Sequence, residues 1–259
     1  MSHPANKIGL VTACLLASLL TGCHKSAAPA PAAAAKPVLS TIDPTTAGSV
    51  SGIISFQGAA PAQVPIDMSQ DPACGLSSST PNQSEQYVVH HGALANVYVY
   101  IQSGLGDRIY ATPTTPVVLD QKGCRYVPHV LAVMAGQPIE VHNSDMTMHN
   151  VHPEPMLSGN HESDITQGPK GDPVTMKFPQ PETMISVRCN NHPWMEAFVN
   201  VAPSPFFAIS DADGQYKIQG LPPGNYKLVA VHEKLGEKET SILIAPHADA
   251  TADFTFEAK

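Results

Sequence analysis

Apolar residues alternate with polar ones in short runs along most of the chain, and turn-forming residues separate the runs. Val97, Val99 and Ile101 alternate in one run, and Ile139 and Val141 in another. Successive side chains of a strand point to opposite faces of a sheet, so this alternation predicts half-buried β-strands. No long stretch stands out with the period of about 3.6 residues that marks an amphipathic helix. The pattern therefore predicts an all-β body.

Two of the predicted strands flank a short polar loop. Ile185 and Val187 lead into Cys189, and Val199 and Val201 lead away from it. We expect this loop to join two strands at one end of a sandwich, where Greek-key β folds present their loops.

The loop carries three potential metal ligands. Its sequence Cys189-Asn190-Asn191-His192-Pro193-Trp194-Met195 has the spacing C-x2-H-x2-M. A thiolate, an imidazole and a thioether suit copper, and two histidines with one cysteine and a weak axial methionine form the blue-copper electron-transfer site. Zinc is disfavoured because a thioether is not among its usual ligands, and a dinuclear copper centre because its loop needs two cysteines. The missing histidine is available upstream in residues 143–152, which contain His149 and His152.

The loop and this upstream segment resemble the cupredoxin family, and most closely its amicyanin type, which shows the same C-x2-H-P-x-M loop and the same H-N-V-H run. The resemblance extends from near Val117 to Val201. It implies a Greek-key β-sandwich whose single copper ion is bound by His149, Cys189, His192 and Met195. It also implies that Asn150 braces the ligand loop through hydrogen bonds. The chain departs from the pattern at Met148, where amicyanins have proline.

The resemblance further implies a route for the electron. The ring edge of His192 would reach the surface and conduct the electron. Pro193 and Trp194 would form part of a small apolar docking patch, in keeping with the small, transient contacts of redox partners. Trp194 as a cap on the core is the alternative that the sequence leaves open.

The C-terminal part has a different signature. Asp211-Ala212-Asp213-Gly214-Gln215-Tyr216 is followed by Gly220-Leu221-Pro222-Pro223-Gly224-Asn225-Tyr226. The pattern resembles carboxypeptidase regulatory-like domains, which implies a small transthyretin-like β-sandwich. The acidic run lacks the spaced acceptors of a calcium loop, so we interpret it as a hairpin turn.

The opening strands of this second type of sandwich, near residues 50–58 and 94–100, come before the cupredoxin-like segment. We therefore expect the cupredoxin to be inserted into the regulatory-like sandwich, because insertion succeeds at exposed loop tips. The alternative is three consecutive pieces, with residues 48–110 as extra cupredoxin strands. The expected ranges are a signal peptide with its lipidated cysteine at 1–23, a linker at 24–46, the regulatory-like sandwich at 47–110 and 205–259, and the cupredoxin at 111–204.

The N-terminus follows the pattern of a bacterial export signal. Lys7 precedes an apolar run from Ile8 to Leu20, which is too short to span a bilayer. The run ends in Leu20-Thr21-Gly22-Cys23, which resembles a lipobox and implies cleavage before Cys23 and a lipid on its sulfur. With His24 rather than aspartate next, the sorting rule implies an outer-membrane lipoprotein that faces the periplasm. An ordinary signal peptide is the alternative.

Residues 24–46 are rich in Ala, Pro, Ser and Thr. They contain too few large apolar residues to fold, and their prolines interrupt any Ala-rich helix. We expect a tether, so that the membrane is reached through the lipid alone.

Charge and cysteine content narrow the partners. The chain has 22 acidic and 14 basic residues, for a formal net charge of −8. This balance argues against nucleic acid and mildly favours a basic partner. Of the five cysteines, Cys14 would leave with the signal, Cys23 would carry lipid and Cys189 would bind copper. The remaining pair, Cys74 and Cys124, predicts a disulfide in the oxidising periplasm.

Other histidines and methionines are weaker candidates for metal binding. His149 and His152 have a spacing that would allow them to pair on a metal, although the amicyanin pattern carries the second histidine as a non-ligand. A second copper site could draw on several further residues, which are His90, His91, His129, His142, His161, Met146, Met148 and Met156.

The leading functional hypothesis is a non-enzymatic carrier of single electrons. Its partner would be a c-type cytochrome or a periplasmic oxidoreductase. No nucleophile triad, phosphate loop or paired-carboxylate motif stands out. The alternatives are a periplasmic copper chaperone or buffer, suggested by the many methionines, and a surface-binding module in which the regulatory-like sandwich recognises a glycan or a protein.

Overall fold

The computed structural model describes residues 38–77 and 82–258. The expected signal peptide, the expected lipidation site Cys23 and the linker up to residue 37 lie outside these ranges. Within them the chain forms strands β1 to β19 and one four-residue helix, which confirms the prediction of an all-β body. No helix among the described residues is long and apolar enough to cross a membrane.

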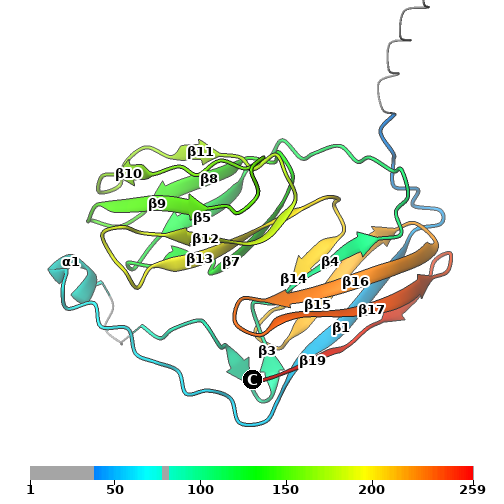
Figure 1. Ribbon diagram of the computed structural model, residues 1–259, viewed down its shortest axis with the longest axis horizontal. Coiled ribbons are helices and arrows are strands. Elements are labelled where there is room, and N and C mark those ends of the chain that lie inside the picture. Colours follow the sequence, from blue (N-terminus) through cyan, green and yellow to red (C-terminus); the bar gives the residue numbers. More distant parts are fainter. Residues whose placement is uncertain (1–37, 78–81, 259) are drawn as a thin grey trace, which may run out of the picture. The chain divides into compact units, whose positions relative to one another are not determined.

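Two sheets take their strands from both ends of the described chain and are here called the first sandwich (Figure 1). Their strands are β1 Gly48–Gln57, β2 Val89–His90, β3 Ala93–Leu94, β4 Tyr98–Ser103, β14 Phe207–Ile209, β15 Gln215–Leu221, β16 Gly224–His232, β17 Gly236–Ile244, β18 Asp249–Thr251 and β19 Phe254–Glu257. One sheet has the order β15-β1-β3-β2, with β18 and β19 parallel to β1, and the other has the order β14-β4-β16-β17. Val50, Ile101 and Leu228 belong to the buried core of the first sandwich.

The other two sheets use only the strands between β4 and β14 and are here called the second sandwich. Their strands are β5 Val117–Gln121, β6 Tyr126–Val127, β7 Val130–Met134, β8 Ile139–Asn143, β9 His149–Glu154, β10 Ile165–Gln167, β11 Val174–Met176, β12 Glu182–Arg188 and β13 Glu196–Ala202. The sheet orders are β10-β9-β12-β13-β7 and β11-β8-β5-β6. Val141, Val187 and Val199 belong to the core of this sandwich, as expected from their alternation in the sequence, and Leu119 joins them there.

The acidic turn at residues 211–214 is not a hairpin turn, and that prediction is wrong. The strand before it, β14, pairs with β4, whereas the strand after it, β15, pairs with β1 in the other sheet. Asp211 Oδ1 accepts hydrogen bonds from the backbone amides of Asp213 and Gln215, each at 2.9 Å. The turn therefore passes the chain between the two sheets, and the local sequence does not encode which strand each neighbour pairs with.

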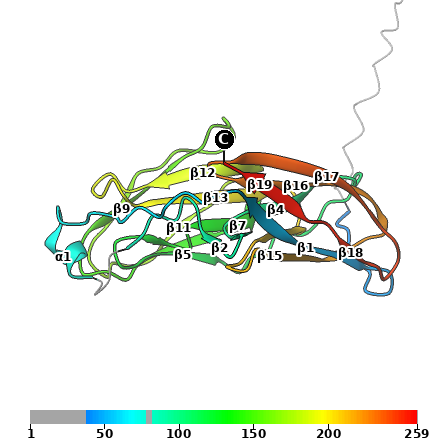
Figure 2. The same ribbon diagram turned by 90° about the horizontal axis from the view of Figure 1, so that it is seen from below.

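The connection from β1 to β2 lies along the second sandwich and carries helix α1, Pro72–Gly75 (Figure 2). We call its described residues 59–77 and 82–87 the strap. Met68 and Cys74 of the strap are buried in the core of the second sandwich. A disulfide joins Cys74 to Cys124, which confirms the pairing predicted from the sequence. The strap is thus part of the first sandwich by chain connectivity and part of the second by packing.

Candidate metal centre

The predicted ligands come together at one end of the second sandwich. Cys189 directly follows β12, and His192 and Met195 lie in the loop that leads into β13. His149 is the first residue of β9, and β12 pairs antiparallel with both β9 and β13. This pairing brings the ends of three strands side by side, so that residues 40 or more positions apart can meet.

The nitrogen and sulfur atoms of three side chains converge at this point. His149 Nδ1 lies 3.0 Å from His192 Nδ1, and Cys189 Sγ lies 3.6 Å from His192 Nδ1. The three ligand atoms are all within 4.8 Å of one another. All three residues are buried, and Met195 is buried in the same core cluster as Cys189.

Hydrogen bonds hold the ligand loop in place. The amide of Met195 donates to the carbonyl of His192 at 2.9 Å, and the amide of Cys189 donates to the carbonyl of Met195 at 3.3 Å. Asn150 contacts the loop twice. Its side-chain Oδ1 accepts from the backbone amide of Asn190 at 3.0 Å, and its backbone amide donates to Cys189 Sγ at 3.4 Å. These hydrogen bonds fix the backbone that carries Cys189, His192 and Met195.

An aspartate forms a hydrogen bond with the Nε2 atom of each histidine, the ring nitrogen that faces away from the sulfur. His149 Nε2 lies 2.9 Å from Asp145 Oδ2, and His192 Nε2 lies 3.0 Å from Asp71 Oδ2. Because an ionised carboxylate only accepts hydrogen bonds, both Nε2 atoms carry hydrogen, and the two Nδ1 atoms can present lone pairs to a metal.

Sequence reasoning missed both aspartates. Asp145 lies four residues before His149, a spacing that could have indicated it. Asp71 lies in the strap, 121 residues before His192, and no local pattern points to it.

The electrostatics of the site favour a thiolate. Burial raises the pKa of Cys189, but hydrogen bonds from His149, from the backbone amides of Asn150 and Asn191, and from His192 outweigh it and lower this pKa to about 6. For His149, burial lowers the pKa, but the hydrogen bonds with Asp145 and Cys189 outweigh burial and raise this pKa to about 9. At neutral pH the sulfur is therefore in the form that binds metals.

His192 does not reach the surface, so the expectation of an exposed ring edge is wrong. The residue is 4% exposed, because Asp71 of the strap covers the Nε2 edge. Pro193 is exposed and Trp194 is partly exposed. The indole Nε1 of Trp194 donates to the carbonyl of Cys124 at 3.1 Å.

Two of the remaining candidate histidines have acidic or amide partners. His152 contacts Glu162 and Asn190, and His142 contacts Glu140. Among the described residues, the groups of His, Cys, Asp and Glu that could hold a metal all include His149 or His192. The described chain thus concentrates these groups at a single place.

Comparisons with known proteins yield only structural matches. No family model matches the chain, and no curated protein matches it significantly. An oxidised mutant of amicyanin is 20% identical over 40% of this chain and 98% of its own, with a TM-score of 0.31. Amicyanin from Paracoccus versutus is 17% identical over 40% of this chain and 97% of its own, also with a TM-score of 0.31.

A further match is a copper-containing nitrite reductase from Thermus scotoductus. It is 20% identical, with a TM-score of 0.31, over 39% of this chain. The matched part spans only 25% of that reductase.

Proposed function

We propose that this protein is a type 1 copper protein that carries single electrons between periplasmic redox partners. The observation that carries the proposal is the buried convergence of His149 Nδ1, His192 Nδ1 and Cys189 Sγ, all within 4.8 Å of one another. Two imidazoles and a thiolate, with a buried methionine on the same loop, form the donor set that blue-copper sites use.

The residues present fit a copper ion. The aspartates hold the Nε2–H groups of both histidines, so the Nδ1 atoms are the donors that copper would bind in place of any proton there, and the lowered pKa of Cys189 supplies a thiolate near neutral pH. Copper, when bound, would supply a one-electron couple. The hydrogen-bonded loop and the buried strand ends keep the ligands in place, which limits the rearrangement that accompanies each electron.

The test is an optical and EPR spectrum of the protein after addition of one equivalent of copper. We expect an intense visible band from thiolate-to-copper charge transfer, and reversible bleaching on reduction. Cys189→Ser should abolish the band, because it is the free cysteine of the described chain and the other two described cysteines are paired. Tight copper binding without the band in the unaltered protein would refute the proposal.

We also propose that the second sandwich is a cupredoxin domain inserted into the first, and that a lipid on Cys23 anchors the protein in the outer membrane. The sheet pairing supports the insertion, because β1 pairs with β15, β18 and β19. In the sequence, all strands of the second sandwich lie between β1 and these three partners. The lipobox-like sequence before Cys23 supports the anchor.

A copper-delivering function is the second candidate. Met146 and Met148 are 71% and 48% exposed in the loop before His149, and exposed thioethers are soft ligands suited to Cu(I). Transfer of copper to an acceptor protein would favour this candidate, whereas reversible reduction at constant copper content would favour the electron carrier.

A further inference from the structure

The strap closes the edge of the metal centre at which an electron was expected to leave. Asp71 Oδ2 lies 3.0 Å from His192 Nε2 and also accepts from Thr147 Oγ1 at 3.2 Å. Its Oδ1 caps helix α1, which the disulfide to Cys124 holds in place. With His192 covered in this way, another group has to connect the metal centre with the surface.

Trp194 makes this connection. The centroid of its ring lies 5.1 Å from that of His192, with the two rings tilted by 49°. The hydrogen bond from its Nε1 to Cys124 fixes the ring. Together with Pro193, Trp194 lines a cavity of about 280 Å³ that opens to solvent between the strap and the second sandwich.

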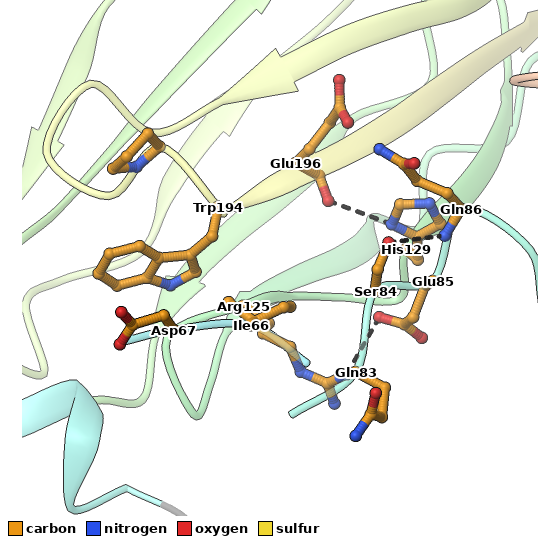
Figure 3. A pocket seen from close by; sticks show the side chains of 11 residues that line it. Ile66, Asp67, Gln83, Ser84, Glu85, Gln86, Arg125, His129, Trp194 and Glu196 are labelled. Atoms are coloured by element: carbon orange, nitrogen blue, oxygen red, sulfur yellow. Dashed lines mark hydrogen bonds and ion pairs between the residues drawn. The ribbon is translucent and has the colours of Figure 1, made fainter. Parts of the chain in front are cut away.

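Most of the other residues that line this cavity are polar, and they include three acidic residues, one arginine and one histidine (Figure 3). Glu85 of the strap pairs with Arg125 at 3.2 Å. Asp67 forms no ion pair with any described residue and lies beside the indole of Trp194, whereas the carboxylate of Glu196 points away from that ring (Figure 3). An uncompensated carboxylate beside an aromatic face favours an ammonium or guanidinium group, which gains from both charge and ring.

We propose that this cavity is the docking site of the redox partner, and that the partner surrounds its cofactor with lysine or arginine side chains. The inference rests on the proposed function and adds to it the exit route and the chemistry of the partner. With copper held by His192 and the other ligands, its one-electron couple would supply an electron that leaves through His192 and Trp194 to the partner's oxidised cofactor, for example a ferric haem that becomes ferrous. No bond is formed or broken, and a basic side chain of the partner pairs with Asp67.

Docking can be measured without copper, because Trp194 is the only tryptophan of the chain. Metal-free protein is titrated at low ionic strength with a basic c-type cytochrome, whose haem quenches Trp194 emission when it docks. The same cytochrome with acetylated lysines serves as the control ligand. We expect saturable quenching by the basic form and none by the acetylated form beyond its absorption of light.

Charge variants test the position of the site. Asp67→Asn keeps the side-chain shape, removes one charge and should weaken binding roughly fivefold, because the partner's basic side chain loses the charge with which it pairs. Asp107→Asn makes the same change in net charge on an exposed residue that does not line the cavity. This control variant should leave binding within about twofold, since Asp107 lies outside the proposed contact.

The copper-loaded protein provides a second readout, the rate at which it reduces the ferric cytochrome. Trp194→Leu should slow this step, whereas Trp194→Phe, which keeps an aromatic ring, should retain most of the rate. Equal effects of the two charge variants, or equal quenching by the acetylated cytochrome, would overturn the docking site. A copper-loaded protein without a blue band would instead refute the proposed function, and the metal-free titration would still decide the docking site.

Discussion

At the scale of single residues, two aspartates act on the metal centre through the histidines that they contact. Asp145 holds His149, and Asp71 holds His192. A carboxylate on the far nitrogen makes an imidazole a stronger donor, which stabilises the more highly charged oxidised metal. Of the two, Asp71 is the residue that the strap contributes.

Asp71→Asn should therefore raise the reduction potential of the copper-loaded protein. The asparagine has a single acceptor oxygen, so it can still cap α1 but then loses the hydrogen bond from His192 together with the negative charge. We expect a rise of roughly 50 mV, which corresponds to about 1 kcal/mol for one electron. Cyclic voltammetry measures it.

Asp67→Asn is the matched control. Asp67 lies in the same strap and also accepts a hydrogen bond from a turn amide, that of Ser69, but it is exposed and touches no ligand. An equal shift in both variants would show that Asp71 does not act through His192.

His232 is a buried histidine away from the metal centre. It is 1% exposed, its Nδ1 accepts from the backbone amide of Lys234, and its Nε2 has no hydrogen-bond partner among the described residues. Burial is the main cause that lowers the pKa of His232, to about 4. The folded protein thus holds this side chain neutral at pH values where the unfolded chain is protonated.

Stability should fall as the pH drops through the interval between about 6.5 and 4. Because the pKa of His232 is lower in the folded protein than in the unfolded chain, its neutral form stabilises the fold at pH values above the unfolded pKa. This contribution, up to about 3 kcal/mol, is lost as the pH falls toward the folded pKa. The neighbouring His129 titrates at higher pH than this interval. Burial lowers the pKa of His129, but the hydrogen bond with Glu233 outweighs burial and raises this pKa. His232→Asn should flatten the fall, as measured by urea unfolding at several pH values. An unchanged pH profile in the variant would contradict this assignment.

At the scale of elements, the strap decides how closed the metal centre is. It is a stretch without strands whose only helix has four residues, and such a segment has little structure of its own. Its position comes from Met68 and Cys74 in the core, from the Glu85–Arg125 ion pair and from the disulfide.

Cys74→Ser with Cys124→Ser should lower the free energy of unfolding by about 2–4 kcal/mol. The disulfide joins residues 50 positions apart, and opening so large a loop restores chain entropy to the unfolded state. The variant should also expose His192, visible as faster exchange of its ring hydrogens in NMR spectra of the metal-free protein. Unchanged exchange would show that the remaining contacts suffice to hold the strap.

At the scale of the whole molecule, the proposed lipid anchor would hold the candidate metal centre at the membrane. Cys23→Ser should move the protein from the membrane fraction to the soluble fraction, or leave it unprocessed, because anchorage rests on this sulfur alone. Fractionation with an antibody against the folded part measures the shift. A variant that still sediments with the outer membrane would overturn the lipoprotein proposal.

The sequence by itself was sufficient for features that depend on neighbouring residues. Alternation predicted the all-β body and the strands around Cys189, because burial of one sheet face imposes a period of two. Three of the four candidate ligands lie within one short loop, so their spacing alone pointed to copper. The disulfide followed from counting cysteines in an oxidising compartment.

Only the tertiary structure decided the features that depend on which distant segments pack together. It placed Asp71 on His192 across 121 residues, and so buried an edge that the family pattern led us to expect at the surface. It also separated β14 and β15 into different sheets, although one short turn joins them. The physical reason is the same in both cases: strand pairing and the course of the strap are settled by long-range burial, for which the local order of residues carries no signal.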